Sequence, residues 1–296
     1  MCFTINKESF NICCNCYCYC VNAEAMKMDE DSEKLDARSF LVNPTLLCHF
    51  YTNVRLTGMT VLNSELFVVQ GRSPQVNVYN TDTYTHSRDI TITGSTGLNA
   101  IVASPRSNCL YVSEAALQVI YQYDHSNDVI NMWFVNGKCY GLSLTSTDNV
   151  LVTLSDTKQI QEYTSRGHLI RDISFDSRIE YPLHSVQLPD DRWVVSHGMG
   201  NPLNRVCIVD MSGRITQSYG ESRGSDVGQL YYFRNLAVDK YGNVLIADQF
   251  NDRVVLLNPS LTHLGYITLP GHHLDSLRVR SNRANLDSRA MLSYPD

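Results

Sequence analysis

Long hydrophobic runs are absent from this sequence of 296 residues. No stretch approaches the roughly 18 to 20 apolar residues that a membrane-spanning helix needs. The first residues also lack the order of basic, apolar and small side chains that marks a secretory signal. The sequence therefore predicts a cytoplasmic protein with no membrane span.

Basic residues are also in short supply. The sequence has 24 Lys and Arg against 30 Asp and Glu, which gives a formal net charge of −6. A strongly basic footprint, the usual mark of a nucleic-acid-binding domain, is therefore missing. With 43% hydrophobic and 18% charged residues, the composition is that of a globular protein and not of a disordered chain.

Cysteine is sparse in the body of the chain and crowded at its start. Cys48, Cys109, Cys139 and Cys207 are widely separated, which predicts reduced thiols in strands or core. The initial run CCNCYCYC lacks the paired, loop-separated cysteines of a zinc site. Metal binding, palmitoylation and a disordered start stay open for it. We expect residues 1–40 to be a cysteine-rich start and an acidic linker, disordered or in a short helix, and we expect no cofactor.

After this start, the sequence repeats a pattern of short apolar strands separated by turn-forming residues. The copies lie about 40 to 51 residues apart, which is the spacing of four-stranded propeller blades. The second strand is the easiest to follow, and it recurs as LFVVQ at Leu66, LYVSE at Leu110, VLVTL at Val150, WVVSH at Trp193 and VLIAD at Val244.

These copies predict an all-β fold, a six-bladed β-propeller of four-stranded antiparallel blades in residues 41–296. Five blades are complete in the sequence. The segment LLCHFY at Leu46 stands alone where the outer strand of a preceding blade is expected. We therefore expect a sixth blade shared between the two termini, so that the ring closes without exposed edges. The match to a strand pattern is weak after about residue 275, and the expected C-terminal contribution begins at Ser276.

The fifth copy carries the most specific motif, which consists of Val238-Asp239, Gly242-Asn243-Val244, Ala247-Asp248 and Asn251-Asp252-Arg253-Val254. This motif resembles the NHL repeat, which is found in six-bladed propellers such as the C-terminal domain of tripartite-motif proteins. The fourth copy keeps Asn204-Arg205-Val206, whereas the first three copies have Gln where Arg253 stands. The resemblance implies the propeller fold, and it implies a substrate-recruiting function.

The residues of this motif are expected to hold strands together. Asp248 and Arg253 lie across a short connection, where carboxylate and guanidinium can pair and Asn251 can satisfy turn amides. Asp239 and Gly242 are expected to form the preceding turn, because glycine readily takes the positive φ that a tight hairpin needs.

A recognition surface is predicted on one face of the ring, where the turns after the second strands and the connections between blades emerge. A rigid ring that presents variable loops is typical of binding domains, and Tyr and Arg are common at binding hot spots. We expect a monomeric, non-catalytic propeller that binds a protein partner on this face, although the sequence contains no RING or B-box pattern. The expected contact residues are Arg72, Lys138, Lys158, Arg178, His197, Arg205, Arg223, Tyr232 and Arg234.

Two alternative functions use the same fold. RNA binding is the first alternative, on the same face. The second is a calcium-dependent, lactonase-like hydrolase, which would need roughly six to eight oxygen ligands, several of them anionic. The expected starts of the inner strands offer no carboxylate, because they carry Thr57, Leu98, Tyr140, His184 and Asn235. The sequence therefore predicts no catalytic residue and no metal site.

Overall fold

The computed structural model describes residues 2–5, 9–14, 17–22, 46–51, 56–198, 204–220, 222–233, 235–239 and 241–268. The regular elements in these ranges are β-strands and one short 3-10 helix, η3 (Gln249–Asn251). None of the described helices is long and apolar enough to cross a membrane.

Five four-stranded antiparallel sheets form the blades of a β-propeller, as the repeats predict. Blade 1 contains β5 (Leu56–Leu62), β6 (Glu65–Gln70), β7 (Gln75–Asn80) and β8 (His86–Thr91). Blade 2 contains β9 (Ala100–Ser104), β10 (Cys109–Glu114), β11 (Val119–Asp124) and β12 (Val129–Phe134). Blade 3 contains β13 (Cys139–Leu144), β14 (Val150–Leu154), β15 (Gln159–Tyr163) and β16 (Leu169–Ser174).

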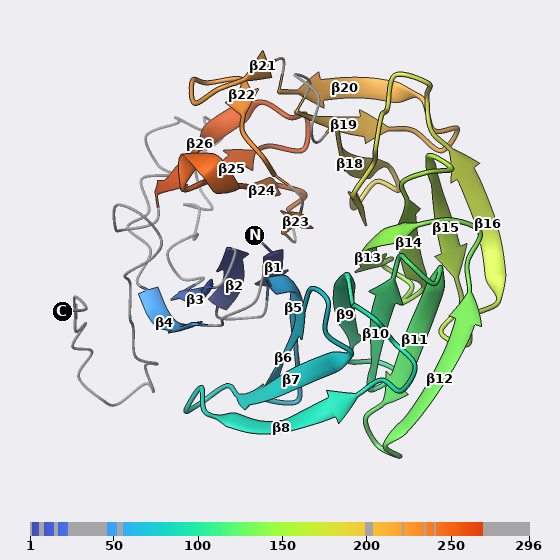
Figure 1. Ribbon diagram of the computed structural model, residues 1–296. Coiled ribbons are helices and arrows are strands. Elements are labelled where there is room, and N and C mark those ends of the chain that lie inside the picture. Colours follow the sequence, from blue (N-terminus) through green and yellow to red (C-terminus); the bar gives the residue numbers. More distant parts are fainter. Residues whose placement is uncertain are drawn as a thin grey trace.

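Blade 4 contains β17 (His184–Gln187), β18 (Trp193–His197), β19 (Arg205–Val209) and β20 (Ile215–Tyr219). Blade 5 contains β23 (Leu236–Val238), β24 (Val244–Asp248), β25 (Arg253–Leu257) and β26 (His263–Thr268). Between these two blades lies a small parallel pair, β21 (Ser222–Arg223) with β22 (Gln229–Leu230). Figure 1 shows the blades around a common centre, with the first strand of each blade innermost and the fourth on the rim.

The core lies between neighbouring blades. The second strands β10, β14, β18 and β24 are buried along their whole length, because both faces of each strand pack against apolar side chains. This explains their nearly continuous apolar sequences. Separate apolar clusters join blade 1 to 2, blade 2 to 3, blade 3 to 4 and blade 4 to 5. Cys109, Cys139 and Cys207 are free buried thiols, as expected, and the side chain of Cys48 lies outside the described residues.

A tight turn joins the first two strands of blade 5. Asp239 Oδ1 accepts hydrogen bonds from the backbone N–H of Tyr241 (2.9 Å) and Asn243 (2.8 Å). Gly242 lies at a φ of 84°, in the left-handed region that costs glycine little. The turn therefore combines a carboxylate that binds backbone amides with a residue that tolerates the required conformation.

The start of the chain contains strands that the sequence analysis missed. Within residues 1–40, the structure contains β1 (Cys2–Ile5), β2 (Ser9–Cys14) and β3 (Tyr17–Asn22). They form a four-stranded antiparallel sheet with β4 (Leu46–Tyr51), in the order β1-β2-β3-β4. The segment FNICC alternates apolar and small polar residues, and this period of two suits a strand.

The segment LLCHFY is the outermost strand of this sheet, as the sequence suggested, but its partner differs from the expected one. It is β4, and it pairs with β3 from the start of the chain. The C-terminal segment expected to share the blade lies in residues 269–296, outside the described residues. The innermost strand, β1, contacts β5 and β23, and Figure 1 shows the sheet between blades 1 and 5.

Candidate interaction surface

The segments expected to form a binding surface do emerge on one side of the ring. Neighbouring strands in each blade are antiparallel, so the end of the second strand and the end of the outer strand fall on the same side. We call this side the loop face. It carries the turns at 71–74, 115–118, 155–158 and 249–252, and the connections between blades at 92–99, 135–138, 175–183 and 222–233.

The expected contact residues are spread around the loop face instead of meeting at one point. Arg72, Lys138, Arg178 and Arg223 are exposed, Lys158, Arg205 and Tyr232 are half-buried, and His197 is buried. Arg234 lies outside the described residues. Arg178 is neutralised by Asp176, with Nε–Oδ1 and Nη2–Oδ2 distances of 2.9 and 2.7 Å. The basic residues therefore do not form a single cationic site.

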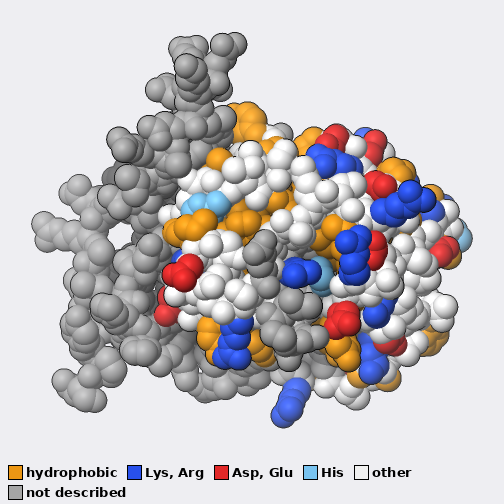
Figure 2. Space-filling view, turned by 90° about the horizontal axis from the view of Figure 1, so that it is seen from above, with side chains coloured by type: hydrophobic (Ala, Val, Ile, Leu, Met, Phe, Trp, Pro, Cys, Tyr) orange, Lys and Arg blue, Asp and Glu red, His pale blue; other side chains and the backbone are white. Residues whose placement is uncertain are grey.

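Charges of both signs are also mixed on the side of the molecule that lies at the top of Figure 1. Figure 2 shows this side, where Lys and Arg side chains are interspersed with Asp and Glu, and hydrophobic side chains gather in one part. The surface in this view lacks a continuous basic field among the described residues.

The motif of blade 5 forms a buried network that anchors the long connection from blade 4. Asp248 is fully buried, and its Oδ2 accepts hydrogen bonds from Arg253 Nε and Asn251 Nδ2, both at 2.8 Å. Its Oδ1 accepts a bond from the backbone N–H of Tyr231 at 2.6 Å. Burial raises the pKa of Asp248, and the bonds from Asn251 and Arg253 act in the opposite direction. The carboxylate therefore depends on these donors.

Arg253 fixes the same connection from a second side. Its guanidinium donates to the backbone oxygens of Ser225 at 2.5 Å and Gln229 at 3.0 Å. Asn251 Nδ2 also donates to the backbone oxygen of Gly224 at 2.8 Å. Blade 5 thus holds residues 224–231 through three side chains, which is a structural role for the motif.

Other blades anchor their loop-face connections with different acidic residues. The fully buried Glu114, at the end of β10, accepts bonds through Oε1 from the backbone N–H of Thr96 (2.8 Å) and Gly97 (3.2 Å). Asp156 Oδ1 accepts a bond from the backbone N–H of Lys138 at 2.7 Å. Burial acts to raise the pKa of Glu114, but bonds from Thr96, Ser95 and Tyr121 together hold it below its ordinary value.

The connection from blade 4 to blade 5 carries Arg223, Tyr231 and Tyr232. Together with Phe250 from the turn of blade 5, these residues form a cluster that we call the blade-5 aromatic cluster (Arg223, Tyr231, Tyr232 and Phe250). The rings of Tyr232 and Phe250 are stacked, with centroids 4.6 Å apart and an interplanar angle of 9°. Tyr231 packs edge-on against Phe250 at 4.8 Å, and the guanidinium carbon of Arg223 lies 3.8 Å from the Tyr231 ring centroid. Phe250 is 49% exposed, so the cluster is available at the surface.

Sequence reasoning singled out Tyr232 and Arg223 but missed Phe250. Phe250 lies in a turn rich in Asn and Asp, and an exposed aromatic residue in such a polar turn is the signal that was available. Phe233, which directly follows Tyr232 in the sequence, is only 2% exposed and packs in the core between blades 4 and 5. Tyr232 on the surface and Phe233 in the core thus have different roles.

The histidine at the start of β17 is fully engaged. The backbone N–H of Leu236 donates to His184 Nδ1 at 3.1 Å, so Nε2 carries the proton and donates to the backbone oxygen of Leu142 at 3.0 Å. This neutral ring joins the inner strands of blades 3, 4 and 5. Burial lowers the pKa of His184 to about 4. Both ring nitrogens are occupied, so the side chain is not free to bind a metal ion or to act as a base.

A second buried histidine lies on the loop face. His197 is opposite Arg205 in the pairing of β18 with β19, and its ring nitrogens have no hydrogen-bond partner among the described residues. Burial, with the nearby charge of Arg205, lowers the pKa of His197 to about 4. In the part of the chain that the structure describes, no three His, Cys, Asp or Glu side chains gather as ligands for a metal ion.

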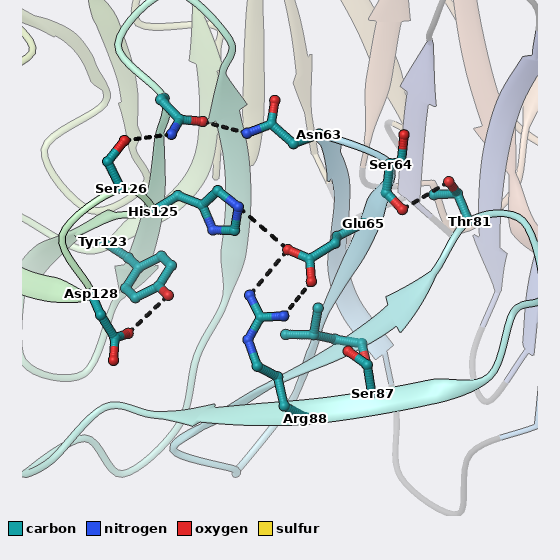
Figure 3. Close-up of polar contacts among 12 residues, drawn as sticks. Asn63, Ser64, Glu65, Thr81, Ser87, Arg88, Tyr123, His125, Ser126 and Asp128 are labelled. Carbon is teal, nitrogen blue, oxygen red and sulfur yellow. Dashed lines mark hydrogen bonds and ion pairs between the residues drawn. The ribbon is translucent and has the colours of Figure 1, made fainter.

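A polar cluster on the opposite side of the ring joins blades 1 and 2 (Figure 3). Glu65 binds the guanidinium of Arg88 with both carboxylate oxygens, and its Oε2 lies 3.5 Å from His125 Nε2. Asn63 donates to Asn108 Oδ1 at 2.6 Å, beside the ion pair. The cluster connects strands of two blades, and we interpret it as part of their interface.

Comparison with known proteins identifies the fold but not a family. No family model and no curated protein matches the sequence. Virginiamycin B lyase from Staphylococcus aureus is 14% identical with a TM-score of 0.56, over 73% of this chain and 70% of that chain. A protein of unknown function from Bacteroides caccae is 12% identical with a TM-score of 0.61, over 88% of this chain and 94% of that chain.

Hydrazine synthase from Kuenenia stuttgartiensis is a third similar structure, 16% identical with a TM-score of 0.56, over 76% of this chain and 68% of that chain. At these identities the likeness extends to the propeller fold alone. Propellers host both enzymes and binding domains, so the function must be argued from the surface of this chain.

Proposed function

We propose that this chain is a non-catalytic propeller that binds a protein partner on its loop face, in the manner of the substrate-recruiting NHL propellers that its fifth repeat resembles. The observation that carries the proposal is the blade-5 aromatic cluster. Its Phe250 ring is 49% exposed and stacks on Tyr232, which is half-buried and stands on a connection anchored by Asp248, Asn251 and Arg253. On the sequence grounds above, we place the protein in the cytoplasm.

The chemistry of the cluster suits a protein hot spot. Tyr and Arg dominate the residues whose loss weakens protein complexes, because they combine a large apolar area with polar groups. The cluster is already ordered by its hydrogen bonds and ring contacts. Binding to it would therefore cost little additional conformational entropy.

We also propose that the β1–β4 sheet is the sixth blade and that it closes the ring. Its innermost strand contacts the innermost strands of blades 1 and 5, which would otherwise be neighbours without a blade between them. Closure removes exposed edges and makes the loop face a rigid platform. In this proposal the sixth blade comes from the start of the chain instead of being shared by the termini.

RNA binding is the second candidate, and the stacked pair of Tyr232 and Phe250 favours it, because bases stack on exposed aromatic rings. The charge on the loop face argues against it, since RNA binding draws on clustered Lys and Arg that neutralise phosphates, whereas Arg178 is already paired with Asp176. A calcium-dependent hydrolase is not supported, because no group of acidic ligands gathers in the part of the chain that the structure describes, and His184 is engaged on both nitrogens.

Affinity recovery from native lysate tests the proposal. The wild-type chain should recover a defined protein, identified by mass spectrometry, and nuclease treatment should not reduce the yield. The double variant Tyr232→Ala, Phe250→Ala should lose the partner while keeping its circular dichroism spectrum. Tyr241→Ala is the matched control, because Tyr241 is an exposed aromatic on the opposite side of the ring. Recovery that depends on RNA and falls steeply with salt would favour the second candidate.

A further inference from the structure

The outer strand of blade 2 has an unusual composition for an edge. β12 has the sequence VINMWF and contains no charged residue. Its large apolar side chains are exposed, with exposed fractions of 46% for Val129, 37% for Ile130, 57% for Met132 and 70% for Phe134. Figure 1 shows β12 on the outer rim of the ring. Among the described strands it pairs only with β11, so its outer edge is unpaired.

Two other outer strands carry more charged or polar side chains than β12. β8 has the sequence HSRDIT, with its charges in the middle of the strand, and β20 has the polar sequence ITQSY. Proteins commonly place charged or polar residues on edge strands because an apolar edge invites pairing with another chain. β12 lacks this protection. β16, on the next blade, adds exposed Leu169 and Ile170 to the apolar rim.

The hydrogen-bond pattern shows which backbone groups of β12 are free. The backbone N–H of Val135, directly after the strand, donates to Gln118 O across the blade at 2.9 Å. Because inward and outward groups alternate along an antiparallel pair, the N–H and C=O groups of Ile130, Met132 and Phe134 point outward. These three residues also share one face of the strand, since side chains alternate with a period of two.

We propose that β12 is a dimerisation edge that pairs antiparallel with β12 of a second copy. A two-fold axis perpendicular to the sheet keeps the faces matched and brings only the central residue opposite its own symmetry mate. With Met132 at the centre, Ile130 of one copy lies opposite Phe134 of the other, and all three outward residues pair. The five-residue overlap from 130 to 134 then consists of apolar residues and one Asn.

Charge at the two ends of β12 favours a second copy as the occupant. Asp128 directly precedes the strand, Asp124 lies opposite Val129 at the end of β11, and Lys138 follows four residues after the end of β12. An antiparallel pair brings the acidic end of one copy beside the basic end of the other, whereas a parallel pair would place like charges together. The dimer edge lies on the rim, away from the blade-5 aromatic cluster, so this inference does not depend on the proposed function. It differs from the monomer expected from the sequence.

Light scattering coupled to size-exclusion chromatography tests the dimer. The wild-type chain should change from the mass of one chain to that of two as its concentration rises. Met132→Lys places two ammonium groups opposite each other at the two-fold axis, and should raise the dimer dissociation constant by about 100-fold or more. Ser218→Lys is the matched control, because it puts the same charge at an exposed position of the outer strand β20, and it should leave the dimer unchanged.

Amide hydrogen exchange locates the interface. The amides of Ile130, Met132 and Phe134 should become protected at concentrations where the dimer forms. If Met132→Lys fails to fold, Phe134→Lys serves as the second variant, and it should remove this protection. A wild-type chain that stays monomeric up to about 1 mM would overturn the proposal. A dimer that survives both Lys substitutions, or that leaves these three amides unprotected, would overturn it as well.

Discussion

Acidic side chains at the ends of second strands and in the turns after them hold the connections of this propeller. Asp248, Glu114 and Asp156 differ in type and in exact position, yet each accepts hydrogen bonds from backbone amides of the connection that enters its own blade. A buried carboxylate is costly unless donors surround it, so Asp248 and Glu114 stabilise the fold only together with their loops, whereas Asp156 makes its bond at the surface. The motif that drew attention in the sequence is therefore one instance of a more general arrangement.

Removal of the Asp248 carboxylate should destabilise the protein. We expect Asp248→Ala to lower the free energy of unfolding by roughly 1 to 3 kcal/mol, because Arg253 and the Tyr231 amide lose a buried partner. Urea denaturation measures this loss. Asp190→Ala is the control, since Asp190 forms an exposed pair with Arg192 and should change stability little. Equal effects of the two substitutions would contradict the account.

Acid should weaken the protein through His184. Its pKa in the folded state is about 4, below the ordinary value of 6.5, so the unfolded chain takes up a proton first as pH falls. The contribution of neutral His184 to the free energy of unfolding is therefore full above pH 6.5. It is lost as pH falls toward 4, by an amount on the order of 3 kcal/mol. Denaturation of wild type and His184→Gln across this range should show a weaker pH dependence in the variant. Parallel curves would show that His184 does not titrate in this way.

At the scale of the element, the second strands were the most predictable part of the molecule. β10, β14, β18 and β24 are buried on both faces, so their apolar runs stand out in the sequence. The strands β1, β2 and β3 of the N-terminal sheet were missed, because cysteine also serves as a metal ligand and a lipidation site, and these possibilities obscured its alternation with apolar residues. Sequence placed Tyr232 on the loop face, but the ring stacking with Phe250 depends on how two distant segments meet.

The connection from blade 1 to blade 2 should depend on Glu114. In Glu114→Gln, the side chain keeps one oxygen that can accept hydrogen bonds. Its NH2 group, which is itself a donor, would face the hydroxyl or backbone donors that the second carboxylate oxygen now accepts from. The buried site would also lose its negative charge. We expect a loss of about 1 to 3 kcal/mol and faster hydrogen exchange at the amides of Thr96 and Gly97. Asp172→Asn, an exposed acidic residue on β16, provides the control. Unchanged exchange at both amides would show that Glu114 does not anchor this segment.

At the scale of the whole molecule, closure of the ring decides whether the loop face is rigid. In the closed ring that we propose, the β1–β4 sheet separates blades 1 and 5 and covers their inner strands. The loop face would then be one continuous platform, with its connections held by side chains of the blades below. The apolar rim formed by β12 is a separate surface with its own partner.

Deletion of residues 1–22 should open the ring. It removes β1, β2 and β3, which leaves β4 without its partner and exposes β5 and β23. We expect aggregation or loss of a cooperative thermal transition, because unpaired edges and apolar surface become exposed. Calorimetry and light scattering measure these two effects. A truncated chain that stays soluble and unfolds at the same temperature would favour the disordered or helical start expected from the sequence.

The most direct test of the central claim is a titration of the recovered partner against the chain, with the loop face altered at one point. Calorimetry should show that Phe250→Ala weakens binding at least about tenfold, since exposed aromatic anchors account for much of the energy of an interface. Tyr241→Ala, on the opposite side of the ring, should bind as tightly as wild type. If Phe250→Ala binds as tightly as wild type and Tyr241→Ala does not, the binding surface lies on the other side of the propeller and the proposed function is wrong.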